Sequence, residues 1–316
     1  MKIIARILKT SVIGAGAAGL VLVVGVHNSS AGIEGSGRLV RAVGRITALG
    51  SIFVDGVEFG LSQARIAIDG RPGSASRLQV GQIVSVEADM TGRDTGTARN
   101  VTFTGDVVGP ISRVDLAASA FVVLGQTVKV DGSTLYGDGI ASAGLQGLAV
   151  GTNVEVSAFV NASGDLMASR VDLQVAGSPL QVNGAVEDLN TPAKTFQIND
   201  LKIDFSQATV TGTLANASTA TVWADEYPTA GTLHATRVEV SAGVGGSSGE
   251  EGRLEGLVTG VSSAGAFYVG EQLVLTDTKT VFVLHGQTLT PNLSVKVHGV
   301  FNATGALVAK MVVAQK

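Results

Sequence analysis

The sequence contains no cysteine, few aromatic residues (4%) and few charged residues (15%). Without cysteine, the chain has no disulfide bond, no thiolate metal site, no cysteine nucleophile and no lipid-anchored N-terminal cysteine. A charged fraction below the usual ~25%, combined with 45% apolar residues, argues against a disordered chain or a coiled coil. The 22 basic and 26 acidic residues give a net charge of −4, so the basic footprint of a nucleic-acid-binding protein is also missing.

Glycine, in contrast, is abundant, with 42 of the 316 residues, which is nearly twice the usual ~7%. A chain of this length and apolar content is able to bury a core and is long enough for about two average domains. Composition alone identifies no chemistry, so the remaining inferences depend on the order of the residues.

The first 31 residues have the three parts of a secretory signal peptide. Lys2, Arg6 and Lys9 supply a basic start, residues 11–26 form an apolar segment, and a run of small residues ends at Ala31. The apolar segment is shorter than the ~20 residues that span a membrane. We therefore expect cleavage after Ala31, a periplasmic or secreted bacterial protein, and no stable membrane insertion of the mature chain. Loss of three of the 22 basic residues leaves 19 against 26 acidic ones, a net charge near −7.

Residues 14–19 also match the Gly-x-Gly-x-x-Gly pattern of dinucleotide-binding folds, and Glu34 stands where the ribose-binding acid would follow. In such folds the glycines connect a strand to a helix whose N-terminus binds the pyrophosphate. Here residues 20–26 have no polar face, and no alternation of strands and helices follows along the chain. The signal-peptide interpretation is therefore favoured, and no cofactor is predicted.

Four blocks of the sequence repeat the same order of features with a period of roughly 70 residues. Each block opens with a glycine followed two positions later by isoleucine or valine, at residues 44–46, 109–111, 184–186 and 256–258. An alternating apolar pair follows, namely Ile52 and Val54, Phe121 and Val123, Phe196 and Ile198, and Phe267 and Val269. Alternation with a period of two residues predicts β-strands with one buried face.

A later strand in each block alternates in the same way, at residues 84–88, 154–158, 221–224 and 295–299. Its valines are predicted to point into the core. The residues that alternate with the inward positions are predicted to point outward, and they include Glu87, Ser157, Trp223 and His298. An Asx residue with a glycine three positions later follows in three of the blocks and predicts a bulged hairpin turn.

In the last strand of a block, Leu166 and Ala168 share a face but Val171 is out of phase, which predicts a β-bulge. Each block therefore contains about five strands, with room for one helical turn between the third and the fourth, and this order is typical of an OB-like barrel. An immunoglobulin sandwich needs ~100 residues, and a β-helix needs much shorter repeats.

We predict an all-β chain of four tandem small OB-like barrels, each with five to six strands, after a cleaved signal peptide. The predicted boundaries are 1–31 for the signal peptide, 38–104, 105–176, 180–242 and 253–316 for repeats 1 to 4, and 243–252 for a flexible glycine- and serine-rich linker.

The repeat resembles a bacterial family described as a domain of unknown function, DUF5666. The resemblance lies in the opening glycine motif, the apolar pair, the Gly-x-x-Val-x-Val strand at residues 81–86 and 151–156, and the Leu-x-Ala ending at residues 166–168 and 307–309. It extends over most of residues 38–314, and it is best in repeat 2 and weakest in repeat 3. These are packing and turn positions, so the resemblance implies a fold, a bacterial origin and an envelope or extracellular location, and it carries over no catalytic residue.

No residue pattern predicts a catalytic or metal site. The histidines His234, His285 and His298 do not have metal-ligand spacing. Residues 245–249 fit the Gly-x-Ser-x-Gly pattern of a serine nucleophile, but such a serine follows a strand and enters a helix, whereas this one stands in the predicted linker.

A cation stands in the last strand of each block, at Arg99, Arg170, Arg237 and Lys310. Such a row could bind an acidic polymer. The cations differ in their offset from the preceding alanine, however, so solvated charges that protect a strand edge are the favoured interpretation.

Trp223, Tyr227 and Tyr268 are the candidate binding residues. By the register of their strands, Trp223 and Tyr268 point outward, while Tyr227 lies in a turn. Exposed aromatic residues often mark contact sites for sugars or proteins. Alternatively, Trp223 packs between neighbouring barrels, in keeping with the high average burial of tryptophan.

These observations favour an exported, non-catalytic protein of the cell envelope that binds a protein or polysaccharide partner or acts as a spacer. An enzyme acting on an envelope polysaccharide is an alternative, and its site would need carboxylates that converge from different repeats. An oligonucleotide-binding protein is a second alternative, which the acidic charge and the scarcity of aromatic residues disfavour.

Overall fold

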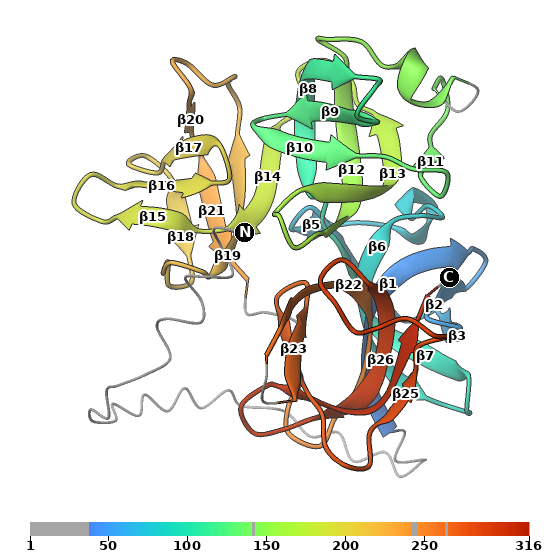
Figure 1. Ribbon diagram of the computed structural model, residues 1–316. Helices are drawn as coiled ribbons and strands as arrows, with labels where there is room; N and C mark the ends of the chain where they lie inside the picture. Colours follow the sequence, from blue (N-terminus) through green and yellow to red (C-terminus); the bar gives the residue numbers. More distant parts are fainter. Residues whose placement is uncertain (1–37, 141–142, 242–244, 263–264, 316) are drawn as a thin grey trace.

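The computed structural model describes residues 38–140, 143–241, 245–262 and 265–315, so the predicted signal peptide lies outside the described residues. Figure 1 shows barrel-like β modules packed against one another. The described residues contain no α-helix and two short 3₁₀ helices, η1 (Ala75–Arg77) and η2 (Gly144–Gly147). The all-β prediction is confirmed. In this part of the chain no helix is long and apolar enough to cross a membrane.

Repeat 1 closes into a barrel. β1 pairs with β2, β2 with β3, β3 in parallel with β7, β7 with β6, and β6 returns to β1. This path is the one expected of an OB-like barrel, and closure removes the exposed strand edges. The strands are β1 (Arg38–Ala48), β2 (Ile52–Val54), β3 (Val57–Gly60), β4 (Arg65–Ile68), β5 (Arg71–Pro72), β6 (Ile83–Met90) and β7 (Thr95–Phe103).

Repeats 2 and 4 close in the same way, along β8–β9–β10–β13–β12 and along β22–β23–β24–β27–β26. The strands of repeat 2 are β8 (Val107–Asp115), β9 (Ala120–Val123), β10 (Gln126–Lys129), β11 (Leu135–Tyr136), β12 (Asn153–Val160) and β13 (Leu166–Leu173). The strands of repeat 4 are β22 (Glu251–Val261), β23 (Ala266–Val269), β24 (Gln272–Leu275), β25 (Val281–Val283), β26 (Ser294–Phe301) and β27 (Leu307–Ala314).

Repeat 3 follows the same order of strand pairing, but its ladder is divided between two sheets. Its first and last strands are each interrupted, so that β15–β16–β17–β20 form a separate sheet while β14, β19, β21 and β18 continue the sheet of repeat 2. The strands are β14 (Leu180–Ala185), β15 (Glu187–Asn190), β16 (Thr195–Ile198), β17 (Leu201–Asp204), β18 (Thr209–Thr211), β19 (Thr219–Ala224), β20 (Thr232–His234) and β21 (Arg237–Val240).

The opening glycine of each repeat lies where the first strand passes close to the second residue of the apolar pair. A Cβ atom added at this glycine would come within 2.5–3.4 Å of that residue, for Gly44 and Val54, Gly109 and Val123, Gly184 and Ile198, and Gly256 and Val269. Such separations leave little or no room for a methyl group. The glycine and the apolar pair are thus the two sides of one steric contact, which explains why they recur together.

The predicted β-bulge is present in repeat 2. The register between β12 and β13 shifts between Ser157 and Ala158, which lie opposite Arg170 and Ala168, so Ser169 has no partner in the ladder. Repeats 1 and 4 have a register shift at the corresponding place. The bulge bends the last strand around the barrel.

The repeats associate in an order that differs from their order along the chain. β1 of repeat 1 pairs in parallel with β22 of repeat 4, and β8 of repeat 2 pairs with β14 of repeat 3, which gives sheets of thirteen and ten strands. Part of the linker predicted over 243–252 lies outside the described residues; of the rest, Glu251 begins β22 and the Gly249 N–H donates to the Phe301 carbonyl at 2.9 Å.

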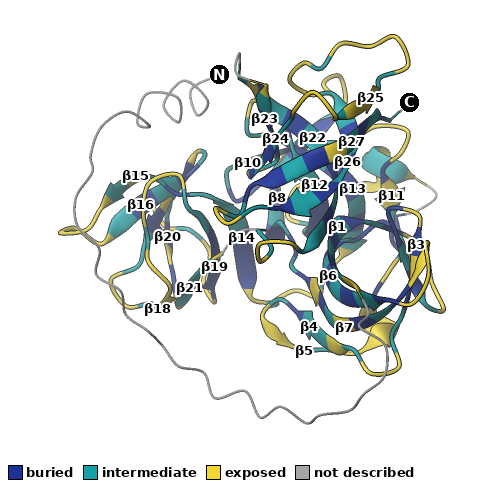
Figure 2. Ribbon diagram, turned by 90° about the horizontal axis from the view of Figure 1, so that it is seen from below, coloured by how far each residue is buried: buried dark blue, intermediate teal, exposed yellow. Residues whose placement is uncertain are grey.

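The core follows this association. Repeats 2 and 3 share one cluster of buried apolar residues, while repeats 1 and 4 each have their own. Figure 2 shows the buried positions along the strands and the exposed ones gathered mainly in the turns. Contacts between repeats therefore shape the surfaces on which a functional site can form.

Candidate functional site

Trp223 is buried, so it does not form an exposed contact site, and the interpretation that it packs between barrels holds. Only 7% of its surface is accessible, and the guanidinium of Arg237 lies 3.5 Å from the centre of its ring. Its neighbour Val222 belongs to the core, so Trp223 does point away from the interior of repeat 3. Trp223 is therefore buried by residues that cover the outer face of repeat 3, in agreement with the interpretation that it packs between barrels.

Trp223 belongs to a row of side chains that crosses the outer face of the ten-stranded sheet. Direct partners on adjacent strands point to the same face, and this junction row consists of Asp172, Glu155, Val108, Gln181, Trp223 and Arg237. The turn that contains Asp69 of repeat 1 lies against it. Gln181 Nε2 donates to Asp69 Oδ1 at 3.2 Å, and Arg237 donates to the Asp69 carbonyl at 3.3 Å. The junction row is therefore the surface on which repeats 2 and 3 hold repeat 1.

Glu155 is the unusual member of the junction row, because its carboxyl group is buried and no described basic side chain forms an ion pair with it. The residue is 8% exposed, Oε2 accepts a hydrogen bond from Gln174 at 2.5 Å, and Oε1 is buried with no hydrogen-bond partner among the described residues. Burial raises the pKa of Glu155 to about 7, and the charges of Asp69 and Asp172 act in the same direction. Near neutral pH this carboxyl therefore takes up a proton readily.

Asp106 is a second enclosed acid, at the contact between repeats 2 and 3. Its carboxyl accepts a hydrogen bond from the Ala158 N–H at 2.8 Å, and its carbonyl accepts one from the Asn183 N–H, also at 2.8 Å. Burial raises the pKa of Asp106 to about 7, although hydrogen bonds from Ala158 and Asn183 oppose the increase. We interpret Asp106 and Glu155 as structural groups because each is engaged in contacts between repeats.

A charged cluster holds repeat 1 against repeat 4. The carboxylate of Asp55, in the turn between β2 and β3, lies 2.5 Å from His298 Nε2, 3.3 Å from Lys296 Nζ and 3.7 Å from Arg253. Burial by itself would raise the pKa of Asp55. The hydrogen bond with His298 and the charges of His298, Lys296 and Arg253 outweigh burial, so the pKa lies below its ordinary value.

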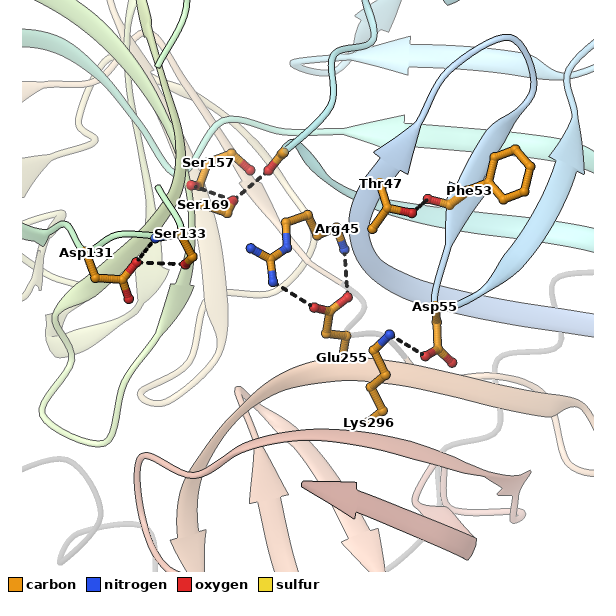
Figure 3. A network of polar contacts seen from close by, with 11 residues as sticks. Arg45, Thr47, Phe53, Asp55, Asp131, Ser133, Ser157, Ser169, Glu255 and Lys296 are labelled. Carbon is orange, nitrogen blue, oxygen red and sulfur yellow. Dashed lines mark hydrogen bonds and ion pairs between the residues drawn. The ribbon is translucent and has the colours of Figure 1, made fainter. Parts of the chain in front are cut away.

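Figure 3 shows Asp55 with Lys296 and two further contacts near repeat 1. Arg45 Nη2 donates to Glu255 Oε1 of repeat 4 at 3.3 Å. The hydroxyl of Ser169, the residue left unpaired by the bulge, donates to the Gly81 carbonyl of repeat 1 at 2.6 Å. Outward positions on the repeat strands therefore serve as contacts between repeats.

No group of three or more His, Asp or Glu side chains in the described part of the chain is arranged to hold a metal ion. The Gly-x-Ser-x-Gly segment at residues 245–249 leads into strand β22 instead of a helix, and its Ser247 N–H donates to Glu250 at 2.9 Å. This serine is therefore not placed as a nucleophile of that type.

Three of the four cations in the last strands are neutralised by a neighbouring carboxylate, in the pairs Arg99 with Asp89, Arg170 with Asp172, and Arg237 with Glu239. The closest nitrogen–oxygen distances are 2.5, 2.6 and 2.8 Å. These side chains consequently do not form a row of free positive charge for an acidic polymer.

A pocket of about 240 Å³, which we term the junction pocket, lies where repeats 2, 3 and 4 meet. Its walls are mainly small or aliphatic, with Val160 and Leu166 from repeat 2, Ala217 from repeat 3 and Val261 from repeat 4. Tyr268, one of the predicted binding residues, lines it from β23 and is partly exposed. Three repeats are therefore needed to build this one cavity.

The amide side chains in the wall of the junction pocket are already engaged in the fold. Asn161 Oδ1 accepts the backbone N–H of Ser163 at 2.8 Å, which caps a turn. Asn199 Nδ2 donates to Gln126 Oε1 at 2.6 Å. These groups leave the pocket with few free hydrogen-bonding positions, so its character is set by the apolar wall.

Glu271 brings a carboxylate to the junction pocket from the turn between β23 and β24. It accepts a hydrogen bond from the Thr219 hydroxyl, and no described basic side chain forms an ion pair with it. Glu271 is exposed to solvent, but nearby protein atoms partly desolvate its carboxyl group and raise its pKa to about 7. The turn itself is fixed, since Thr259 Oγ1 donates to the Gly270 carbonyl at 2.5 Å. The sequence gives no signal for Glu271, because its surroundings come from other repeats.

Tyr227 lies elsewhere. It is 54% exposed and lines a separate pocket of about 370 Å³ between repeats 2 and 3, with Pro110, Leu124 and Leu201. The structure therefore does not bring the three predicted aromatic residues together: Trp223 is enclosed in the junction row, and the two tyrosines face different pockets.

Comparison with known proteins identifies the repeat. The model of a family described as Domain of unknown function (DUF5666) matches residues 43–102, 108–172 and 255–312, which are repeats 1, 2 and 4, the three whose ladders close without interruption. No curated protein matches the chain. The matches together include more than half of the sequence, and the chain therefore belongs to the DUF5666 family, a domain of unknown function.

Proposed function

We propose that this protein is an exported, non-catalytic binding module of the bacterial cell envelope, and that it holds its partner at the junction pocket. The observation that carries the proposal is a cavity assembled from three repeats, with an apolar wall, a partly exposed tyrosine and a carboxylate on a fixed turn. Apolar pockets with a few convergent polar groups are the default candidates for ligand sites.

Export rests on the sequence of residues 1–31, where a basic start, an apolar segment and small residues before the cleavage position follow one another. N-terminal sequencing of the protein recovered from the envelope or the medium tests it. A mature chain that begins at Gly32 supports export, and an intact Met1 in a protein recovered only from the cytoplasm refutes it.

A binding role is favoured over the hydrolysis of a polysaccharide. Glycoside hydrolysis commonly uses two carboxylates on either side of the scissile bond. Glu271 is the one carboxylate among the described residues that line the junction pocket. The enzymatic alternative therefore has no specific observation in its favour.

A protein is favoured over a polysaccharide as the partner. A sugar chain presents many hydroxyl groups, each of which needs a hydrogen-bonding position when it is buried. The wall of the junction pocket is mainly apolar, and Asn161 and Asn199 are already bonded within the fold. An apolar side chain of a protein packs against such a wall without leaving hydroxyl groups unpaired, as a sugar would.

The test is affinity capture from envelope extract with the exported protein, its Tyr268→Ala variant and its Tyr227→Ala variant, with binding to envelope glycans measured in parallel. The proposal predicts a captured protein that depends on Tyr268 and not on Tyr227. Capture that depends only on Tyr227 would place the site in the other pocket. Glycan binding that depends on Tyr268 would replace the protein partner by a polysaccharide.

A further inference from the structure

The size of the junction pocket limits what enters it. A volume of about 240 Å³ is below the ~300–1,000 Å³ of pockets for drug-sized ligands, so it accommodates a single side chain or ring rather than an extended chain. Its wall of glycine, alanine and valine residues suits an apolar stem or ring. The partner therefore inserts one group here and makes its other contacts outside.

Glu271 determines which charge the pocket favours in the inserted group. The only hydrogen bond of its carboxylate within the described residues comes from the Thr219 hydroxyl, and no basic side chain neutralises it. It is the one acidic or basic side chain in the described wall apart from the phenol of Tyr268. Because Glu271 is exposed, a cationic group can reach its carboxylate, and beside the apolar wall of the pocket the two charges attract each other more strongly than in open water.

We propose that the junction pocket recognises a cationic group with an apolar stem, such as the lysine or arginine side chain of a partner protein, through an ion pair with Glu271 and packing against Tyr268. This inference rests on the proposed binding function. The net charge of −4, which nears −7 without the first 31 residues, favours the approach of a basic partner as well.

The pocket is built before the ligand arrives. Gly270 and Glu271 stand in a turn held to β22 by the bond from Thr259, and by a second bond of 3.0 Å from the Gly270 N–H to the Leu257 carbonyl. A fixed carboxylate needs little ordering on binding, so charge selectivity is large even for a small ligand.

Three probes that share a phenylethyl stem and differ in charge test the proposal by calorimetry at pH 8, where Glu271 is mainly ionised: 2-phenylethylammonium, 2-phenylethanol and 3-phenylpropionate. We expect the ammonium to bind about tenfold or more tightly than the alcohol, which corresponds to about 1.4 kcal/mol, and the propionate to bind most weakly. Glu271→Gln should abolish the preference for the ammonium while it retains binding of the alcohol. Glu226→Gln, on an exposed turn, is the matched control and should change neither.

Equal binding of the ammonium and the alcohol, or a preference that survives Glu271→Gln, would overturn the charge recognition. If all three probes bind equally and Tyr268→Ala weakens each, the pocket remains a binding site and only its charge selectivity is wrong. If none of the probes binds, both the occupant proposed here and the location of the site in the proposed function fail.

Discussion

Replacement of Glu155 by glutamine is expected to stabilise the protein at alkaline pH. In the folded chain this carboxyl is 8% exposed, one oxygen has no partner among the described residues, and the other accepts a hydrogen bond from Gln174. Glutamine has nearly the same shape and keeps an oxygen for Gln174, but it does not ionise. The substitution therefore removes a buried negative charge beside Asp69 and Asp172 and leaves the packing in place.

The sign and size of this change in stability follow from proton linkage. Below pH 4.5 the carboxyl is protonated in both folded and unfolded chains, so ionisation has no effect on stability. Between pH 4.5 and about 7 the unfolded chain loses the proton first, and the folded chain becomes progressively less stable. An increase in pKa from 4.5 to about 7 corresponds to about 3 kcal/mol above pH 7. The unpaired amide of the variant is expected to offset this by about 1 kcal/mol.

The measurement is urea unfolding at pH 5 and pH 8, followed by circular dichroism and by the fluorescence of the single tryptophan. Glu155→Gln should be more stable than the wild type by about 2–3 kcal/mol at pH 8 and close to it at pH 5. Glu226→Gln, at an exposed position, should match the wild type at both values. A difference that is independent of pH, or a variant less stable than the wild type at pH 8, would refute the assignment of Glu155 as a buried carboxyl with a raised pKa.

Three further substitutions probe the junctions and the repeat motif. Trp223→Ala should lower the free energy of unfolding by about 3 kcal/mol or more, while Tyr227→Ala should change it by less than about 1 kcal/mol. Equal effects of the two substitutions in thermal unfolding would mean that the junction row does not enclose the tryptophan. Asp55→Asn should cost about 3 kcal/mol at pH 7, because it removes the buried carboxylate that Lys296, Arg253 and His298 share. Since the pKa of Asp55 lies below its ordinary value, this cost should shrink as the pH falls below about 4, and a cost that stays constant in acid unfolding curves would contradict the ion cluster. Gly256→Ala should cost about 1–3 kcal/mol in urea unfolding, because its Cβ would lie 2.7 Å from Val269. Gly60→Ala should be tolerated, because its Cβ would lie 3.8 Å from the nearest atom. The reverse order of stability would disprove the steric account of the motif.

The interior of each repeat could be predicted because the contacts that form it are encoded within about 65 residues and appear four times. The alternation around Phe121 and Val123 marks the buried face, and the phase slip before Val171 marks the bulge. Repeat 3, the weakest match to the pattern, is also the repeat whose ladder is divided between two sheets.

The candidate site was predicted only in part, because its elements come from different repeats. Tyr268 was identified as an outward aromatic residue, but Glu271 gives no signal in its own strand pair, and the wall opposite is supplied by repeats 2 and 3. Trp223 was placed correctly with respect to its own repeat, but the sequence did not decide between an exposed contact site and packing between barrels; Arg237 and the junction with repeat 1 cover it.

The sequence by itself determined the β architecture, the length of the repeat, the inward face of each strand and the need for an opening glycine, because these depend on the local period of two and on steric contacts inside one module. Only the tertiary structure decided which outward positions become buried. Repeat 1 meets repeat 4 through Asp55 and His298, which are 243 residues apart. A repeated core specifies every module in the same way, whereas docking depends on the side chains in which the modules differ, and those follow no period.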